Sequence, residues 1–246
     1  VEINITDDEV IVEGVGLHGL EAPSEALYTG NSGTTTRLLC GILAGQPFTV
    51  TMSGDPSIQK RPMGRVMKPL REMGASIEGK NDNFCPLTLF PSELHGIEYL
   101  LPVASAQLKS AILLAGLYAE GQTTVIEPAP SRDHTERMFR ALGVEIETSG
   151  STITLDPPED LHAVDIAVPG DISSAAFFLV AGAIIPGSEL TIKNVGVNPT
   201  RTGVLDVLRD MGADITESNF RDEAEPMCDL TVKYSKLHGV EIGGAI

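Results

Sequence analysis

The sequence predicts an α/β fold built by internal repetition, and three observations carry this prediction. Three similar segments each contain a glycine followed by a short alternating strand pattern. These glycines, Gly74, Gly143 and Gly212, lie at equal intervals of 69 residues. Each one follows an amphipathic helical pattern, at the place where a helix end favours a left-handed residue. Upstream of each amphipathic helix is a second helical stretch that is apolar nearly all round. Equal intervals with matching flanks are typical of a structural repeat.

The first helix of each unit should be the buried one. These helices are expected at Thr34–Ala44, Ser105–Ala119 and Ile172–Ile185. Because a helix that is apolar on all sides is buried on all sides, the three should form the cores of the repeats. A glycine follows each helix and opens a strand, as in Phe48–Met52 and Thr123–Ile126.

The second helix of each unit ends at the repeated glycine, within the segments Pro69–Ile77, Phe139–Ile146 and Val207–Ile215. Each unit therefore reads helix, strand, helix, strand, strand, with another strand before the next unit. Strand patterns at Ile3–Ile5 and Val10–Val12 are expected to be the tail of an earlier unit.

The repeat also predicts the domain organisation. Residues 1–158 are expected to form a first globular half, with two full units and the tail of an earlier one. Residues 159–246 are expected to begin a second half with one truncated unit. The segment Asp156–Asp160 is the best linker candidate, because it is acidic and its two adjacent prolines make it rigid.

Charge and composition exclude several classes of function. Lys and Arg number 17 against 34 Asp and Glu, a formal net charge of −17, so the surface should repel nucleic acid and anionic lipid. No apolar run is long enough to predict a membrane-spanning helix. The three cysteines are isolated and the five histidines show no metal-like spacing, so neither a disulfide framework nor a metal site is expected. A reducing cytoplasm is the natural location for such a chain.

A glycine-rich segment before the first apolar helix is a candidate anion site. Gly30–Arg37 reads Gly-Asn-Ser-Gly-Thr-Thr-Thr-Arg. Glycines let a backbone approach a ligand closely, and a helix N-terminus offers free N–H groups to an anion. Arg37 adds a fixed charge one turn into the helix. The pattern alone favours an anion site and an ordinary capped loop about equally.

An arginine precedes the amphipathic helix of every unit. These residues are Arg61, Arg132 and Arg201. A basic residue at a helix start opposes the helix dipole unless an anion binds there, and arginine suits bidentate binding of carboxylate or phosphate. Each arginine is also interpretable as a solvated charge, but three in so acidic a chain favour anion binding. Ser105 opens the second apolar helix and, taken alone, is best interpreted as an N-cap.

Five segments, in order along the chain, resemble the motifs of the 5-enolpyruvylshikimate-3-phosphate synthase family. They are Asn31–Arg37, Lys60–Arg65, Ala104–Ser110, Ser131–Glu136 and Gly170–Ala175. The resemblance covers essentially the whole chain, and Ala106 with the pair Ser131 and Arg132 resembles the class II bacterial branch. It implies the enolpyruvyl transferase fold, an inside-out α/β barrel of six βαβαββ units, of which about three are present here.

The resemblance also implies a reaction. The family transfers the enolpyruvyl group of phosphoenolpyruvate to the 5-hydroxyl of shikimate 3-phosphate, on the way to chorismate and the aromatic amino acids. It implies no metal and no organic cofactor. Glyphosate is then expected as an inhibitor at the phosphoenolpyruvate site, and the full-length enzyme is expected to be a cytoplasmic monomer. No nucleic acid or membrane partner is expected.

The resemblance assigns site residues position by position. Those expected to hold phosphoenolpyruvate are Asn31, Gly33, Arg61 and Gln107. Those expected to hold shikimate 3-phosphate are Ser105, Ala106, Gln107 and Arg132, with Thr34 and Arg37 in support of the first loop. The family's acid and base residues would lie before Val1 and after Ile246, so no catalytic residue is expected within the chain, and the chain alone is expected not to turn over.

Two other interpretations stay open at this point. UDP-N-acetylglucosamine enolpyruvyl transferases share the fold and the phosphoenolpyruvate chemistry, and they carry a Cys or Asp on the loop before their Arg-Pro pair. In this sequence Asp55 lies on that loop. The chain is also interpretable as a folded binding module without catalysis.

Overall fold

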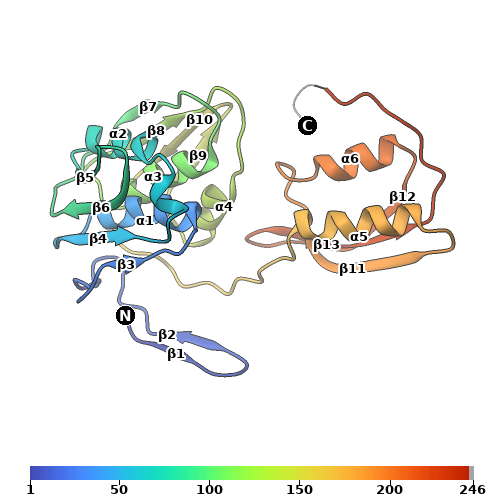
Figure 1. Cartoon of the computed structure of the whole chain (residues 1–246), viewed down its shortest axis with the longest axis horizontal. Coiled ribbons are helices and arrows are strands. Elements are labelled where there is room, and N and C mark those ends of the chain that lie inside the picture. The colour runs from blue at the N-terminus through green and yellow to red at the C-terminus, as the bar shows by residue number, and fades with distance from the viewer. Residues whose placement is uncertain (244–246) are drawn as a thin grey trace. The chain divides into compact units, whose positions relative to one another are not determined.

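The computed structural model describes residues 1–243 and divides into two compact units (Figure 1). The first unit comprises Val1–Ser131 and Leu142–Ala163. The second comprises Arg132–Ala141 and the chain from Val164 onward. The sequence-based boundary after residue 158 stays a prediction.

The first complete repeat lies in the first unit. Its elements are β3 (Leu27–Tyr28), α1 (Gly33–Ala44), β4 (Val50–Ser53), a short 3-10 turn (Ile58–Lys60), α2 (Gly64–Glu72), β5 (Ser76–Lys80) and β6 (Phe84–Phe90). The strands lie in the order β3-β4-β6-β5. The pair β3 and β4 is parallel, and the other neighbours are antiparallel.

The second repeat has the same sheet topology. Its elements are β7 (Glu98–Leu100), α3 (Ala106–Gly116), β8 (Thr123–Ile126), α4 (His134–Ala141), β9 (Ile146–Ser149) and β10 (Thr152–Leu155). The strands lie in the order β7-β8-β10-β9, again with one parallel pair followed by antiparallel neighbours. Helix α4 is the one element of this repeat that belongs to the second unit. The shared strand order confirms the repeat that the glycine spacing predicts.

The third repeat lies in the second unit. Its elements are α5 (Ile172–Ile184), β11 (Glu189–Gly196), α6 (Gly203–Asp210), β12 (Asp214–Asp222) and β13 (Pro226–Lys233). The strands lie in the order β11-β13-β12, and all neighbours are antiparallel. An isolated parallel bridge between Gly170 and Val195 stands where the other repeats have their first strand.

The three repeated glycines end helices as predicted. Their φ angles are +101° at Gly74, +84° at Gly143 and +92° at Gly212, a region that side chains other than glycine rarely adopt. Each follows the last turn of α2, α4 or α6. The left-handed residue turns the chain from the helix into the next strand.

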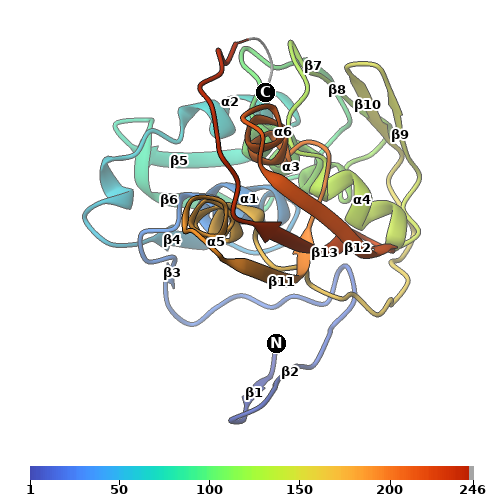
Figure 2. The ribbon, with the colours of Figure 1, turned by 90° about the vertical axis from the view of Figure 1, so that its right-hand side faces the viewer.

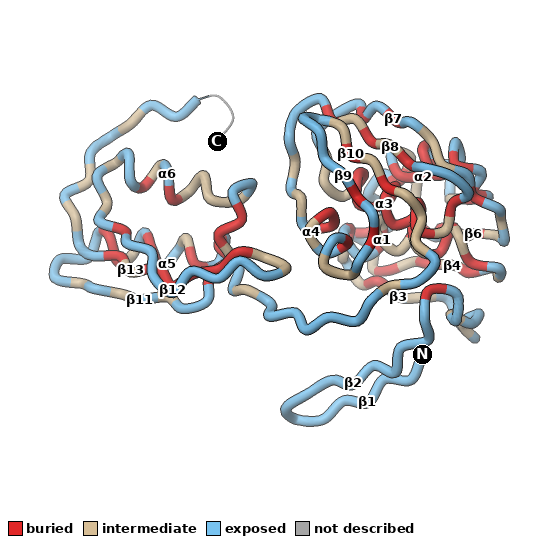
Figure 3. The backbone as a smooth tube through the Cα atoms, turned by 180° about the vertical axis from the view of Figure 1, so that it is seen from behind, coloured by how far each residue is buried: buried red, intermediate tan, exposed pale blue. Residues whose placement is uncertain are grey.

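The core of the first unit is the contact between α1 and α3. Every residue of α3 from Leu108 to Gly116 is buried, as the apolar pattern predicts (Figure 3). The two helices approach so closely at Gly41 that a methyl group added there would lie 2.2 Å from the carbonyl oxygen of Ala111. Glycine at this position is therefore required by the backbone-to-backbone contact.

The prediction that the third apolar helix is buried on all sides is wrong. One side of α5 packs on β11 and β13, with Leu179 and Ala183 buried (Figures 1 and 2). The other side is open, and Phe177 and Phe178 are 79% and 61% exposed. In the first unit α1 and α3 cover each other, whereas no second apolar helix covers α5 among the described residues of its own unit.

The two N-terminal strands form as predicted but stand apart from the repeats. β1 (Ile3–Ile5) and β2 (Val10–Val12) pair only with each other, as an antiparallel hairpin with exposed side chains. Within residues 1–243, no helix combines the length and the apolar character needed to cross a bilayer.

Candidate anion-binding site

Helix α1 begins with a serine N-cap. The hydroxyl oxygen of Ser32 accepts a hydrogen bond of 3.1 Å from the backbone N–H of Thr35. Gly33 is the first helical residue and is buried, while Asn31 is exposed just before the cap. Serine satisfies one of the free N–H groups of the first turn, so the remaining ones are available to an anion.

Two arginines lie against this helix start. A methyl group added at Gly33 would lie 2.8 Å from Nη1 of Arg37 and 3.2 Å from Nη1 of Arg61. Burial lowers the pKa of Arg37 from its ordinary value, and the charges of Arg61 and Arg65 lower that pKa further. Like charges gathered at a helix N-terminus in a chain of net charge −17 favour the binding of an anion.

Gln107 joins the starts of α1 and α3. Its side-chain carbonyl accepts a hydrogen bond of 2.9 Å from Nη1 of Arg37, and its Nε2 donates one of 2.7 Å to the hydroxyl of Thr34. These partners lie about seventy positions away in the sequence. The contacts bring four of the predicted site residues, Gly33, Thr34, Arg37 and Gln107, into one cluster, with Arg61 beside it.

The other predicted residues of the first unit lie at the start of α3. Ser105 is its N-cap, and the serine hydroxyl accepts a bond of 3.4 Å from the N–H of Leu108. Ala106 is the first helical residue and is followed directly by Gln107. Both helix starts are therefore capped by serine, and the side chain of Gln107 in α3 links them through its hydrogen bonds to α1.

Arg132 belongs to the second unit. There it lines an open hollow of about 420 Å³ together with Ser173, Thr200 and Arg201. Arg201 donates a hydrogen bond of 2.6 Å to Ser173 and contacts the carboxylate of Asp171 at 3.3 Å. The expected approach of Arg132 to the start of α3 stays a prediction.

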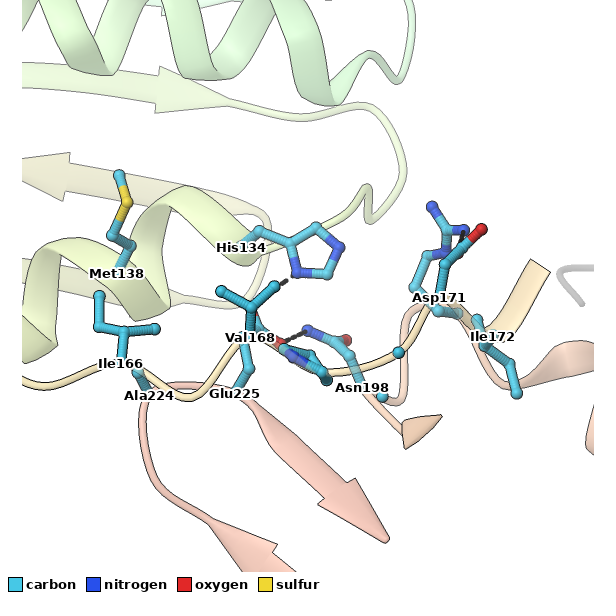
Figure 4. A pocket seen from close by; sticks show the side chains of 13 residues that line it. His134, Met138, Ile166, Val168, Asp171, Ile172, Asn198, Ala224 and Glu225 are labelled. Carbon is cyan, nitrogen blue, oxygen red and sulfur yellow. Dashed lines mark hydrogen bonds and ion pairs between the residues drawn. The ribbon is translucent and has the colours of Figure 1, made fainter. Parts of the chain in front are cut away.

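Another pocket of the second unit is mainly apolar. It has a volume of about 380 Å³ and is lined by residues that include Met138, Ile166 and Val168, with a hydrogen bond of 2.7 Å between Nδ1 of His134 and the carboxylate of Glu225 (Figure 4). None of the residues assigned to either substrate lines it. An apolar lining does not suit an anion, so we place the candidate anion site at the helix starts instead.

Two further residues bear on the candidate site. Arg65 has no assigned role in the motifs, but it lies in the first turn of α2, and its charge is one of those that lower the pKa of Arg37. The carboxylate of Asp55 accepts hydrogen bonds of 2.9 Å from the N–H groups of Ser57 and Ile58. Asp55 thus stabilises the loop that leads into the 3-10 turn, which gives it a structural role and weakens the second transferase interpretation. Among the described residues, no group of three or more His, Cys, Asp or Glu side chains is placed to hold a metal ion.

The comparisons with known proteins point to one family. The family model described as EPSP synthase (3-phosphoshikimate 1-carboxyvinyltransferase) matches residues 1–243. A 3-phosphoshikimate 1-carboxyvinyltransferase of Geobacillus thermodenitrificans is 58% identical over 100% of the chain, and one of Thermoanaerobacter sp. is 53% identical. An EPSP synthase structure from Acinetobacter baumannii superimposes with a TM-score of 0.92 at 50% identity and covers 98% of the chain. The chain spans 57% of the Geobacillus protein and 56% of the Acinetobacter chain.

Proposed function

The chain belongs to the EPSP synthase family and has its α/β enolpyruvyl transferase fold. On this basis we propose that the chain contributes to the transfer of the enolpyruvyl group from phosphoenolpyruvate to the 5-hydroxyl of shikimate 3-phosphate. The observation that carries the proposal is the arginine cluster at the start of α1, which Gln107 links to the start of α3. Both substrates are anions, and the cluster offers them charge in an otherwise acidic chain. A cytoplasmic location and a monomeric full-length enzyme are part of the proposal.

The proposed roles follow the geometry of the two helix starts. Phosphoenolpyruvate would lie at the start of α1, held by Arg61, Asn31, Gly33 and Gln107, while Arg37 and Thr34 keep Gln107 in place. The phosphate of shikimate 3-phosphate would lie at the start of α3, on Ser105, Ala106 and Gln107. Arg132 would bind the shikimate part. Charged donors fixed in advance lower the cost of gathering negative charge in the transition state. We assign no acid or base role to a described residue.

Shikimate 3-phosphate is expected to stabilise the chain against heat. A ligand that binds only the folded state adds about 2.7 kcal/mol of stability at one hundred times its dissociation constant. The measurement is the melting temperature of the chain with shikimate 3-phosphate and with shikimate, which lacks the phosphate and should have no effect. Stabilisation by UDP-N-acetylglucosamine in place of shikimate 3-phosphate would support the second transferase, and no response to either would support a chain without substrate binding.

Glyphosate is proposed to occupy the phosphoenolpyruvate site, and Gly33 is expected to control its affinity. In Gly33→Ala the new methyl group fills space beside the ends of Arg37 and Arg61, both of which are flexible and able to shift. Glyphosate is longer than phosphoenolpyruvate, so the added methyl group should reduce the affinity for glyphosate more than the affinity for phosphoenolpyruvate. In an enzyme of the relatives' full length that carries residues 1–243, the inhibition constant for glyphosate should rise more than the KM for phosphoenolpyruvate. Equal changes in both constants would contradict the steric explanation.

A further inference from the structure

A buried ion pair lies one turn inside the start of α3. Nζ of Lys109 is 2.9 Å from Oε2 of Glu127, and the two side chains are 1% and 5% exposed. Lys109 stands in a helix whose residues from Leu108 to Gly116 are all buried. The backbone N–H of Lys109 donates a hydrogen bond of 3.0 Å to the carbonyl of Ser105, the cap of the helix.

The carboxylate of Glu127 has a second partner. Its other oxygen, Oε1, accepts a hydrogen bond from the hydroxyl of Ser131. Glu127 directly follows β8, and its backbone N–H donates a hydrogen bond of 2.8 Å to the carbonyl of Ser151. Both the backbone and the side chain of Glu127 are therefore fixed. The network of Lys109, Glu127 and Ser131 ties the loop after β8 to the first turn of α3, within the first unit.

Stability alone does not account for this arrangement. Removing two charges from water costs several kcal/mol for each ion, and apolar side chains of similar volume often stabilise such a position as well or better. What the ion pair provides, and an apolar pair would not, is an oxygen that binds the hydroxyl of Ser131. Ser131 lies in the loop after β8, so this bond holds that loop beside the first turn of α3, which also carries Ala106 and Gln107.

We propose that Lys109 and Glu127 are positioning residues for shikimate 3-phosphate: the pair anchors Ser131, and with it the loop after β8, against the first turn of α3, where the phosphate is proposed to lie. The proposal rests on the proposed function, because it needs shikimate 3-phosphate at this helix start. Neither residue touches the substrate. Lys109 neutralises and orients the carboxylate, and Glu127 holds the serine.

Two double variants separate the anchor from the ion pair. Lys109→Met with Glu127→Met removes both charges and the acceptor for Ser131. Lys109→Met with Glu127→Gln removes both charges but keeps an acceptor oxygen for the serine hydroxyl. The measurements are the dissociation constant for shikimate 3-phosphate, by calorimetry on the chain, and the melting temperature of each variant. We expect both variants to fold, with affinity about tenfold weaker in the Met/Met variant and within about threefold of the original chain in the Met/Gln variant, since one neutral hydrogen bond is lost in the first and kept in the second.

Ser131→Ala keeps the inference testable if a double variant does not fold. This substitution leaves the ion pair in place and should weaken binding about as much as the Met/Met variant does. Adding it to the Met/Met variant should change little more, because both act through one contact. Unchanged affinity in Ser131→Ala, or in a folded Met/Met variant, would overturn the proposal, and so would an equal loss in both double variants. The affinity of the original chain for shikimate 3-phosphate is measured before that of any variant. If the original chain does not bind shikimate 3-phosphate, that result contradicts the proposed function itself rather than the role of the ion pair.

Discussion

Replacing Arg61 with alanine is expected to weaken phosphoenolpyruvate binding tenfold to a hundredfold. A hydrogen bond between charged groups contributes roughly 1.5 to 3 kcal/mol, and about 1.4 kcal/mol corresponds to a factor of ten in affinity. The fold should not depend on this side chain. Arg61 is exposed, and its guanidinium makes a long hydrogen bond of 3.5 Å to the hydroxyl of Ser57. The KM for phosphoenolpyruvate, measured in an enzyme of the relatives' full length that carries residues 1–243, reports the change.

Lys68→Ala is the matched control for Arg61. Lys68 is also a cation of the α2 region, but its side chain is 73% exposed and it pairs with Glu72 on the same helix. Removing an exposed charge of this kind should change the KM for phosphoenolpyruvate little, because solvent and salt screen the charge. A KM that rises equally in both variants would mean that only net charge matters, and Arg61 would then have no specific role in the site.

Gly41→Ala is expected to destabilise the first unit by about 3 kcal/mol, at the upper end of the usual cost of overpacking a core. The added methyl group would lie 2.2 Å from the carbonyl oxygen of Ala111 and 3.0 Å from Cβ of Leu114. The nearest atom belongs to the backbone of α3, so relief requires the two helices to separate. Urea unfolding measures the loss, which corresponds to a fall of more than a hundredfold in the ratio of folded to unfolded chains.

Gly116→Ala is the control for this effect, because it adds the same methyl group to the partner helix. There the nearest atoms are side-chain atoms, at 3.1 Å in Thr123 and 3.2 Å in Leu155, so a shift of a few tenths of an ångström relieves the contact without separating the helices. Alanine is also the better helix former by roughly 0.5 to 1 kcal/mol, which offsets part of the crowding. Equal stability of the two variants would show that the approach of α1 to α3 is looser than its geometry indicates.

Short-range patterns explain why so much of the fold is predictable from sequence. Glycines 74, 143 and 212 and the helices before them are recognised within ten residues or so, and the strand order of each repeat follows from their recurrence. The open side of α5 is not predictable in this way. An apolar residue such as Phe177 is buried only if another element packs over it, and the sequence of the helix alone does not show whether such an element is present.

The candidate site is predictable in part for the same reason. Serine caps and helix starts are local features, whereas the bonds of Gln107 to Arg37 and Thr34 cross some seventy positions, and only the family resemblance indicates that these residues belong together. The motifs assign no role to the ion pair of Lys109 and Glu127, although the sequence carries a signal for it. A lysine inside a helix that is expected to be buried on all sides needs an acidic partner, because an unpaired buried charge is strongly destabilising.

The uncovered side of α5 has a consequence for how copies of the chain behave together in solution. The side chains of Phe177 and Phe178 are largely exposed to water, and exposed apolar surface favours association between copies. Opposing it, a net charge of −17 keeps neighbouring copies apart. The range of that repulsion shrinks from about 10 Å in 0.1 M salt to about 3 Å in 1 M salt, while apolar attraction persists. Concentrated solutions should therefore remain clear at low ionic strength and scatter light as salt is added, which is the reverse of the salting-in expected when ionic contacts hold copies together.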